Sequence, residues 1–183
     1  MATPIGHSLA GYVIYRFRVR HGQDRRPVLL LLALVMANAP DLDFVVGILA
    51  GTPAAYHQGL SHSFALALIA SVFATAVLRT AFYMPAGPVF VLGFLCYSSH
   101  LVIDLFGPDR RPPFGIPLFW PVSDRTFLSP VQVFLGAHHV NTASASTSDW
   151  VRAVLTLQNV AAIGLEVVIM LPFLFLATRA RAR

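Results

Sequence analysis

Apolar residues gather in five runs along the chain, and polar side chains collect at the ends of those runs. The runs are Val28–Ala39, Phe44–Gly51, Phe64–Leu78, Val89–Phe106 and Val151–Ala177. A helix needs about 20 mostly apolar residues to cross the hydrocarbon core of a bilayer. With their flanking residues the last three runs reach that length, and the predicted spans are His62–Met84, Gly87–Phe106 and Val151–Ala177.

The two runs before residue 52 are shorter, and Pro40 separates them. The first is predicted to be a half-span that ends at Asp41-Leu42-Asp43, and the second a short piece after it. A weaker segment, Ile5–Tyr15, is either an amphipathic surface helix or a short span. The expected fold is therefore all-α, a polytopic membrane helix bundle with four to five membrane-embedded segments.

One integral membrane domain accounts for all 183 residues. Five regions are expected within it: 1–26, an N-terminal helix and basic loop; 27–106, the membrane core with the candidate metal motifs; 107–150, a loop; 151–178, the last transmembrane helix; and 179–183, a basic tail. The loop is rich in proline and then in Thr, Ser and Ala, which is typical of a segment that does not span.

Composition narrows the class of protein. Apolar residues make up 56% of the chain and charged residues 11%, against roughly 45–50% and about 25% in soluble domains. The net charge is +5, and all thirteen cationic side chains are Arg. These figures exclude a disordered chain and a soluble nucleic-acid module, so membrane lipid is the expected partner and nucleic acid is not.

The arginines are distributed unevenly between the ends of the predicted spans. Nine of them, the cluster within 16–26, Arg79 and the three in 179–183, fall on one side if Ile5–Tyr15 crosses or dips into the membrane. The other four, Arg110, Arg111, Arg125 and Arg152, fall on the opposite side. The positive-inside rule then predicts a multi-pass membrane protein with the first group in the cytoplasm.

Aspartate and histidine near apolar segments are the candidate chemistry, because burying them unpaired is expensive. His100 and Asp104 are four residues apart and share a helix face, either as a hydrogen-bonded structural pair or as metal ligands. Asp41 and Asp43 either cap the next helix or bind a divalent cation. Ser61 is a candidate N-cap for the helix that follows.

The predicted topology places seven such side chains toward the outer face: His7, Asp41, Asp43, His57, His62, His100 and Asp104. Imidazole with carboxylate suits zinc first, with manganese or iron as alternatives, and seven donors suit one ion or two. Asp41 or Asp43 is a ligand or a catalytic base. On the same side Arg110, Arg111 and Arg125 either bind a phosphate or anchor the protein to lipid headgroups.

Five short motifs carry a family resemblance over residues 3–127. They are Thr3-Pro4-Ile5-Gly6-His7, Pro40-Asp41-Leu42-Asp43, His57-Gln58-Gly59-Leu60-Ser61-His62-Ser63, His100-Leu101-Val102-Ile103-Asp104 and Leu118-Phe119-Trp120-Pro121-Val122-Ser123-Asp124-Arg125. In their order and spacing the chain resembles the bacterial membrane-bound metal-dependent hydrolases, also described as LexA-binding, inner-membrane-associated hydrolases. That family usually has Arg where this chain has Gln58.

That family is in turn similar to the zinc-dependent phospholipase C and single-strand nuclease superfamily. The resemblance implies an all-α fold with clustered zinc ions. It also implies that Asp104 bridges two metals and that His7 serves the second of them.

These observations favour a membrane-bound, metal-dependent hydrolase of a phosphoester or phospholipid-like substrate. The first alternative is a metal-ion carrier or sensor, because transporters use broken helices such as the one expected at Pro40. The second is a non-catalytic membrane scaffold that keeps the same residues.

The arginine distribution generates a topological prediction. In a Cys96→Ala background, a cysteine replacing Ala145 should react with a membrane-impermeant thiol reagent applied to intact cells. A cysteine replacing Arg181 should react only after the membrane is opened, because the basic tail is expected in the cytoplasm. Labelling from outside at position 181 but not at position 145 would reverse the arrangement.

Overall fold

A computed structural model describes residues 2–19, 26–50, 57–109, 114–138, 152 and 155–181. The described part is all-helical, and its only extended pairing is one antiparallel bridge between Ile116 and Phe127. The described helices are α1 (Pro4–Arg18), α2 (Arg26–Asn38), η1 (Ala39–Leu42), α3 (Asp43–Leu49), η2 (Leu60–His62), α4 (Phe64–Phe82), α5 (Ala86–Leu105) and α7 (Leu157–Arg181). The all-α prediction is confirmed.

Four helical segments of the described chain are long and apolar enough to cross a membrane: Pro27–Gly47, Phe64–Phe82, Ala86–Leu105 and Leu157–Ala180. The last helix starts later than the apolar run predicts. Leu155 and Thr156 form a turn, and the Thr156 hydroxyl accepts a hydrogen bond from the Asn159 amide at 3.3 Å. A hydroxyl in this position caps a helix start, which explains the boundary at Leu157.

The first candidate span is broken where the sequence predicts it. Pro40 has no amide hydrogen, and the chain passes from α2 into the 3-10 turn η1 before α3 begins at Asp43. A proline disrupts the regular hydrogen bonds of a helix interior. The break brings both aspartates, Asp41 and Asp43, to a bend between two helical pieces.

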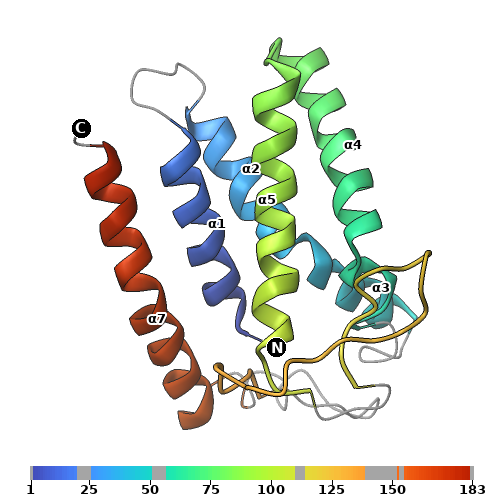
Figure 1. Cartoon of the computed structure of the whole chain (residues 1–183), viewed down its shortest axis with the longest axis vertical. Coiled ribbons are helices and arrows are strands. Elements are labelled where there is room, and N and C mark those ends of the chain that lie inside the picture. The colour runs from blue at the N-terminus through green and yellow to red at the C-terminus, as the bar shows by residue number, and fades with distance from the viewer. Residues whose placement is uncertain are drawn as a thin grey trace.

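The helices form one bundle around a core that contains Ala33, Leu92, Cys96 and Leu101, all fully or almost fully buried. Helix α1 lies between α2, α5 and α7, and α4 packs mainly against α5 (Figure 1). Small residues permit the close approach of α1 and α2. A Cβ atom built on Gly11 would lie only 2.8 Å from the Ala33 carbonyl oxygen and 2.8 Å from the Ala37 Cβ.

The two ends of the bundle differ in character. Figure 1 shows the first turn of α1, the η1–α3 bend, the start of α4 and the end of α5 together at the lower end. The loop after α5 runs across that end, and the Phe64 amide donates to the Leu118 carbonyl at 2.9 Å. The last turns of α1 and α7 and the α4–α5 connection lie at the upper end.

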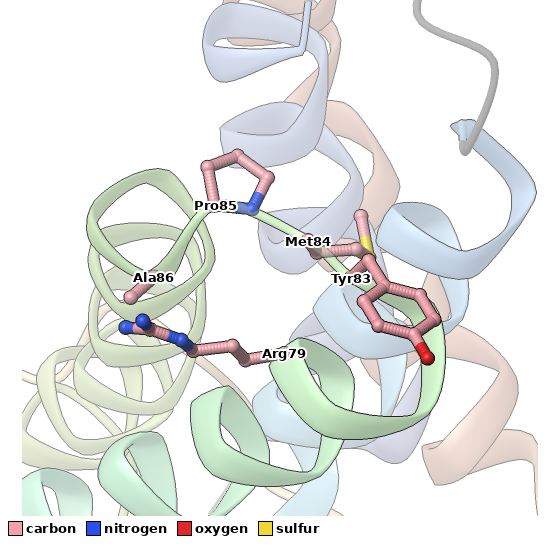
Figure 2. A pocket seen from close by; sticks show the side chains of 5 residues that line it. All are labelled: Arg79, Tyr83, Met84, Pro85 and Ala86. Carbon is pink, nitrogen blue, oxygen red and sulfur yellow. The ribbon is translucent and has the colours of Figure 1, made fainter.

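A shallow hollow of about 480 Å³ lies at this upper end, lined by Arg79, Tyr83, Met84, Pro85 and Ala86 (Figure 2). Arg79 extends toward Ala86 while the Tyr83 ring lies on the other side. Arg79 is the only charged side chain among these residues, so the hollow contrasts with the polar lower end.

Two glycines in helices give a matched stability test. Gly11→Ala should lower the free energy of unfolding by about 1–3 kcal/mol, because its methyl group must displace the α2 backbone. Gly164→Ala should leave stability unchanged or raise it by up to about 1 kcal/mol, since a Cβ at Gly164 meets no atom within 4 Å. Unfolding in detergent micelles measures both, and equal effects would contradict the close α1–α2 contact.

Candidate metal centre

Seven His and Asp side chains converge at the lower end of the bundle. They come from the first turn of α1, the η1–α3 bend, the turn before α4 and the last turns of α5: His7, Asp41, Asp43, His57, His62, His100 and Asp104. Each of the seven candidate ligands named from the sequence is therefore in this group, which we call the His/Asp cluster. All four His side chains and Asp104 have no exposed side-chain surface.

Within the cluster, four side chains form a compact set of donor atoms: Asp41, His62, His100 and Asp104. The Asp104 Oδ2 atom lies 3.3 Å from His100 Nε2 and 3.4 Å from His62 Nε2. The Asp41 Oδ1 atom lies 3.5 Å from His100 Nε2 and 3.7 Å from His62 Nε2. Two carboxylates thus alternate with two imidazoles around a common centre.

These separations fit a tetrahedral metal ion better than they fit hydrogen bonds. N–H···O hydrogen bonds measure about 2.7–3.2 Å. Donor atoms about 2.0–2.2 Å from a tetrahedral zinc are about 3.3–3.6 Å from one another. The same four atoms are buried and have no hydrogen-bond partner among the described residues: Asp41 Oδ1, His62 Nε2, His100 Nε2 and Asp104 Oδ2. The residues present therefore fit a bound divalent cation.

The second ring nitrogen of each imidazole in the set has its own partner. His100 Nδ1 lies 2.8 Å from the Ala37 carbonyl oxygen, which can only accept, so Nδ1 carries the proton. His62 Nδ1 lies 3.0 Å from the Ser61 hydroxyl oxygen and 3.4 Å from Asp43 Oδ2. Partners of this kind orient metal-binding imidazoles and leave the Nε2 lone pair directed at the metal.

Asp43 belongs to a second, overlapping set with His57 and His62, but its oxygens are already engaged. Oδ1 is 2.9 Å from His57 Nδ1, and Oδ2 accepts from the Gln58 amide at 3.1 Å and the Ser61 hydroxyl at 2.9 Å. The geometry therefore favours Asp43 as the group that orients two histidines. Asp41, in contrast, has an oxygen, Oδ1, that has no hydrogen-bond partner among the described residues and could bind a metal.

The prediction that Ser61 caps the next helix is wrong. Helix α4 begins at Phe64, and its cap is Ser63, whose hydroxyl accepts from the Leu66 amide. Ser61 lies inside the short η2 turn, where its hydroxyl donates to Asp43. That turn moves the helix start two residues further along and leaves Ser61 free to join the cluster.

His7 lies beside the four-donor set rather than within it. Its ring stacks on His100 with centroids 3.6 Å apart, and its Nε2 is 3.5 Å from Asp104 Oδ1. Neither of its ring nitrogens has a hydrogen-bond partner. Asp104 therefore presents Oδ2 to His62 and His100, while its Oδ1 faces His7 and accepts from the Ala2 amide.

The electrostatics of the cluster favour a positive charge at its centre. Burial would lower the pKa of His62, but the carboxylates of Asp104, Asp41 and Asp43 raise that pKa well above its usual value. The pKa of His7 is lowered, first by burial and then by the charge of His100. A cation at the centre would replace the proton that the carboxylates otherwise attract to His62.

The structure describes one of the three arginines that were predicted to bind an anion. Arg125 is exposed on the loop after α5, and Arg110 and Arg111 lie outside the described residues. Gln58 takes part through its main chain, since its amide donates to Asp43 and its backbone is left-handed (φ 61°). This contact uses no side-chain atom of Gln58.

Three groups near the cluster were missed by the sequence reasoning. They are the Ala37 carbonyl, the Ala2 amide, which donates to Asp104 Oδ1 at 3.2 Å, and the Tyr97 hydroxyl, which donates to the Ser61 carbonyl at 2.7 Å. Main-chain groups leave no trace in a sequence. Tyr97 lies three residues before His100, and this spacing on one helix face could have identified it.

Comparison with known proteins links this architecture to one family. Comparisons with curated proteins and with solved structures gave no match. The model of a family described as YdjM inner membrane protein matches residues 1–183. Because that match covers the whole length, and because the described chain has several long apolar helices, this membrane-bound protein belongs to the YdjM inner membrane protein family.

Proposed function

We propose that this protein is a metal-dependent hydrolase that cleaves a phosphoester of a membrane lipid. The observation that carries the proposal is the set of four buried ligand atoms on Asp41, His62, His100 and Asp104, none of which has a hydrogen-bond partner in the described part of the chain. Leaving that many buried polar atoms unsatisfied is costly. A divalent cation, with zinc as the first candidate, would satisfy all of them at once.

A cation held there would activate water and stabilise negative charge at phosphorus. His62, His100 and Asp104 would hold the ion together with Asp41, and Asp43 would keep two histidines in orientation. Asp41 faces the solvent side, since its side chain is 15% exposed while the side chains of the other three donors have no exposed surface. Substrate and water would reach the centre past Asp41.

The surroundings of Asp41 support an amphiphilic substrate. Leu42, Val46 and Leu60, which are 60%, 54% and 52% exposed, lie in η1, α3 and η2, the short elements that carry Asp41, Asp43 and His62. Asp41 also lies within the candidate span Pro27–Gly47. A lipid could therefore keep its acyl chains in the bilayer while its phosphate reaches the cluster, and exposed Arg125 on the adjoining loop could bind that phosphate.

The position of the cluster favours a hydrolase over a metal-ion carrier. Carriers bind their cargo near the middle of the membrane, between broken helices. Here the donors lie at one end of the bundle, with His62 just before α4 and Asp104 next to the last residue of α5. Although the chain is broken at Pro40, that break is also at the same end (Figure 1).

Metal content separates the proposal from a scaffold without metal. Protein purified gently in the presence of zinc should retain at least one ion per chain. His100→Ala and Asp104→Asn should lose most of it, since the first removes a ligand atom and the second replaces a charged carboxylate with a neutral amide. His138→Ala is the matched control, because exposed His138 belongs to neither group of donors. Elemental analysis measures all four proteins, and equal metal content, or none in the wild type, contradicts the proposal.

The two neighbouring aspartates should differ in their effects. Asp41→Asn should lower lipid hydrolysis by orders of magnitude, because it alters a donor atom. Asp43→Asn should weaken metal binding by about 10–100-fold, as expected for a group that orients ligands, so added zinc should restore much of its activity. Phosphate or headgroup release from phospholipid vesicles measures this, with chelator-treated wild type and Asp124→Asn as controls. Identical responses to zinc would refute the separate roles.

A further inference from the structure

Glu166 is the only glutamate in the chain, and it lies within the apolar helix α7 with 1% of its surface exposed. It is not one of the donors of the His/Asp cluster. Both oxygens of its carboxylate accept hydrogen bonds from Thr3: the amide donates to Oε1 at 2.6 Å, and the hydroxyl donates to Oε2. An ionisable group in such a helix usually has a specific task.

Thr3 is the cap of α1, so Glu166 acts on the start of that helix. The Thr3 hydroxyl accepts from the Gly6 amide at 3.3 Å while it donates to Glu166. The amides at a helix start carry partial positive charge, which a carboxylate stabilises. Helix α7, which packs mainly against α1, thus supplies an acceptor to the α1 terminus from another part of the chain.

The same turn of chain leads directly into the His/Asp cluster. Ala2, next to Thr3, donates its amide to Asp104 Oδ1 at 3.2 Å. His7 begins the helical hydrogen bonding, since its amide donates to the Thr3 carbonyl at 3.2 Å. Two buried carboxylates, Asp104 on α5 and Glu166 on α7, therefore bind the consecutive residues Ala2 and Thr3. The first turn of α1, which follows these residues, positions the His7 ring against His100 and Asp104.

Gly6 shows how closely α1 and Glu166 approach. A Cβ atom built on Gly6 would lie 2.7 Å from both Glu166 Cδ and Glu166 Oε2. Real Cβ atoms essentially never come so near, so a side chain at position 6 would displace the carboxylate from Thr3. Contact this close leaves α1 little freedom to rotate or slide while the hydrogen bonds to Thr3 are made.

We propose that Glu166 is a positioning residue that fixes the start of α1 and thereby holds His7 in the His/Asp cluster. What His7 does there rests on the proposed function, but its placement by Glu166 does not. The side chain acts through Thr3 and belongs to neither group of His and Asp side chains that could hold a metal. It therefore extends the functional unit from the lower end of the bundle to a residue within the last helix.

Accessibility of individual histidines tests the placement without any metal. Diethyl pyrocarbonate modifies accessible imidazoles, and mass spectrometry of peptides locates each adduct. In metal-free protein in detergent, Glu166→Leu should raise the modification rate of His7 by about tenfold, the scale expected when hydrogen bonds to a charged group are lost. Glu166→Gln, which keeps one acceptor oxygen, should fall between Glu166→Leu and wild type. His62, whose ring does not stack on His7, should keep its wild-type rate, whereas His100 can gain accessibility because the His7 ring covers it.

Two further pairs keep the test decisive. Thr3→Val should release His7 and Thr3→Ser should not, and this pair replaces the Glu166 variants if those do not fold. Val168→Ala, at a 63% exposed position of α7, is the control. Wild-type His7 rates in both Glu166→Leu and Thr3→Val refute the proposal, and so does an equal rise at all buried histidines. If wild type binds no Zn²⁺, the proposed function fails while the labelling still decides the placement.

Discussion

The burial of the Asp104 carboxylate is the constraint on which the lower end of the bundle depends. Removing such a group from water costs several kcal/mol unless it is compensated. Its Oδ2 atom faces His62 and His100, and its Oδ1 atom faces His7 and accepts from the Ala2 amide. The start of α1, the turn before α4 and the end of α5 must therefore meet at one point.

Helix ends and short turns, rather than helix middles, supply this meeting point. The Pro40 break brings Asp41 to the other side of the two imidazoles, and the η2 turn delays the start of α4 until Phe64. Irregular backbone of this kind is tolerated beside a membrane where it is buried in protein or lines a polar site. The long helices can then remain mostly apolar, because the buried His and Asp side chains are concentrated at one end.

Much of the arrangement was predictable because apolar runs and spacing are visible in a sequence. The long helices, the break at Pro40 and the shared face of His100 and Asp104 follow from proline chemistry and helical periodicity. The distinction between Asp41 and Asp43 was not predictable. It depends on which oxygens the Gln58 amide and the Ser61 hydroxyl reach, and those contacts arise only in the folded chain.

The partner of Glu166 was beyond sequence reasoning for the same reason, since Thr3 lies 163 positions away and contributes its main-chain amide. Likewise, the Ala2 amide reaches Asp104 across 102 positions. Such contacts depend on how far each helix is shifted along its neighbours in the bundle. The spacing of residues within one segment carries no information about that shift.

The two central imidazoles, those of His62 and His100, differ in whether a mutation can remove the hydrogen-bond partner of Nδ1. The partner of His100 Nδ1 is the carbonyl of Ala37, a main-chain atom that no substitution at position 37 can remove. The partners of His62 Nδ1 are the side chains of Ser61 and Asp43, which single-base changes can replace. Mutation can therefore change the basicity and orientation of the His62 ring without changing the partner of His100. The centre thus combines one imidazole whose partner is a main-chain atom with one whose side-chain partners can vary.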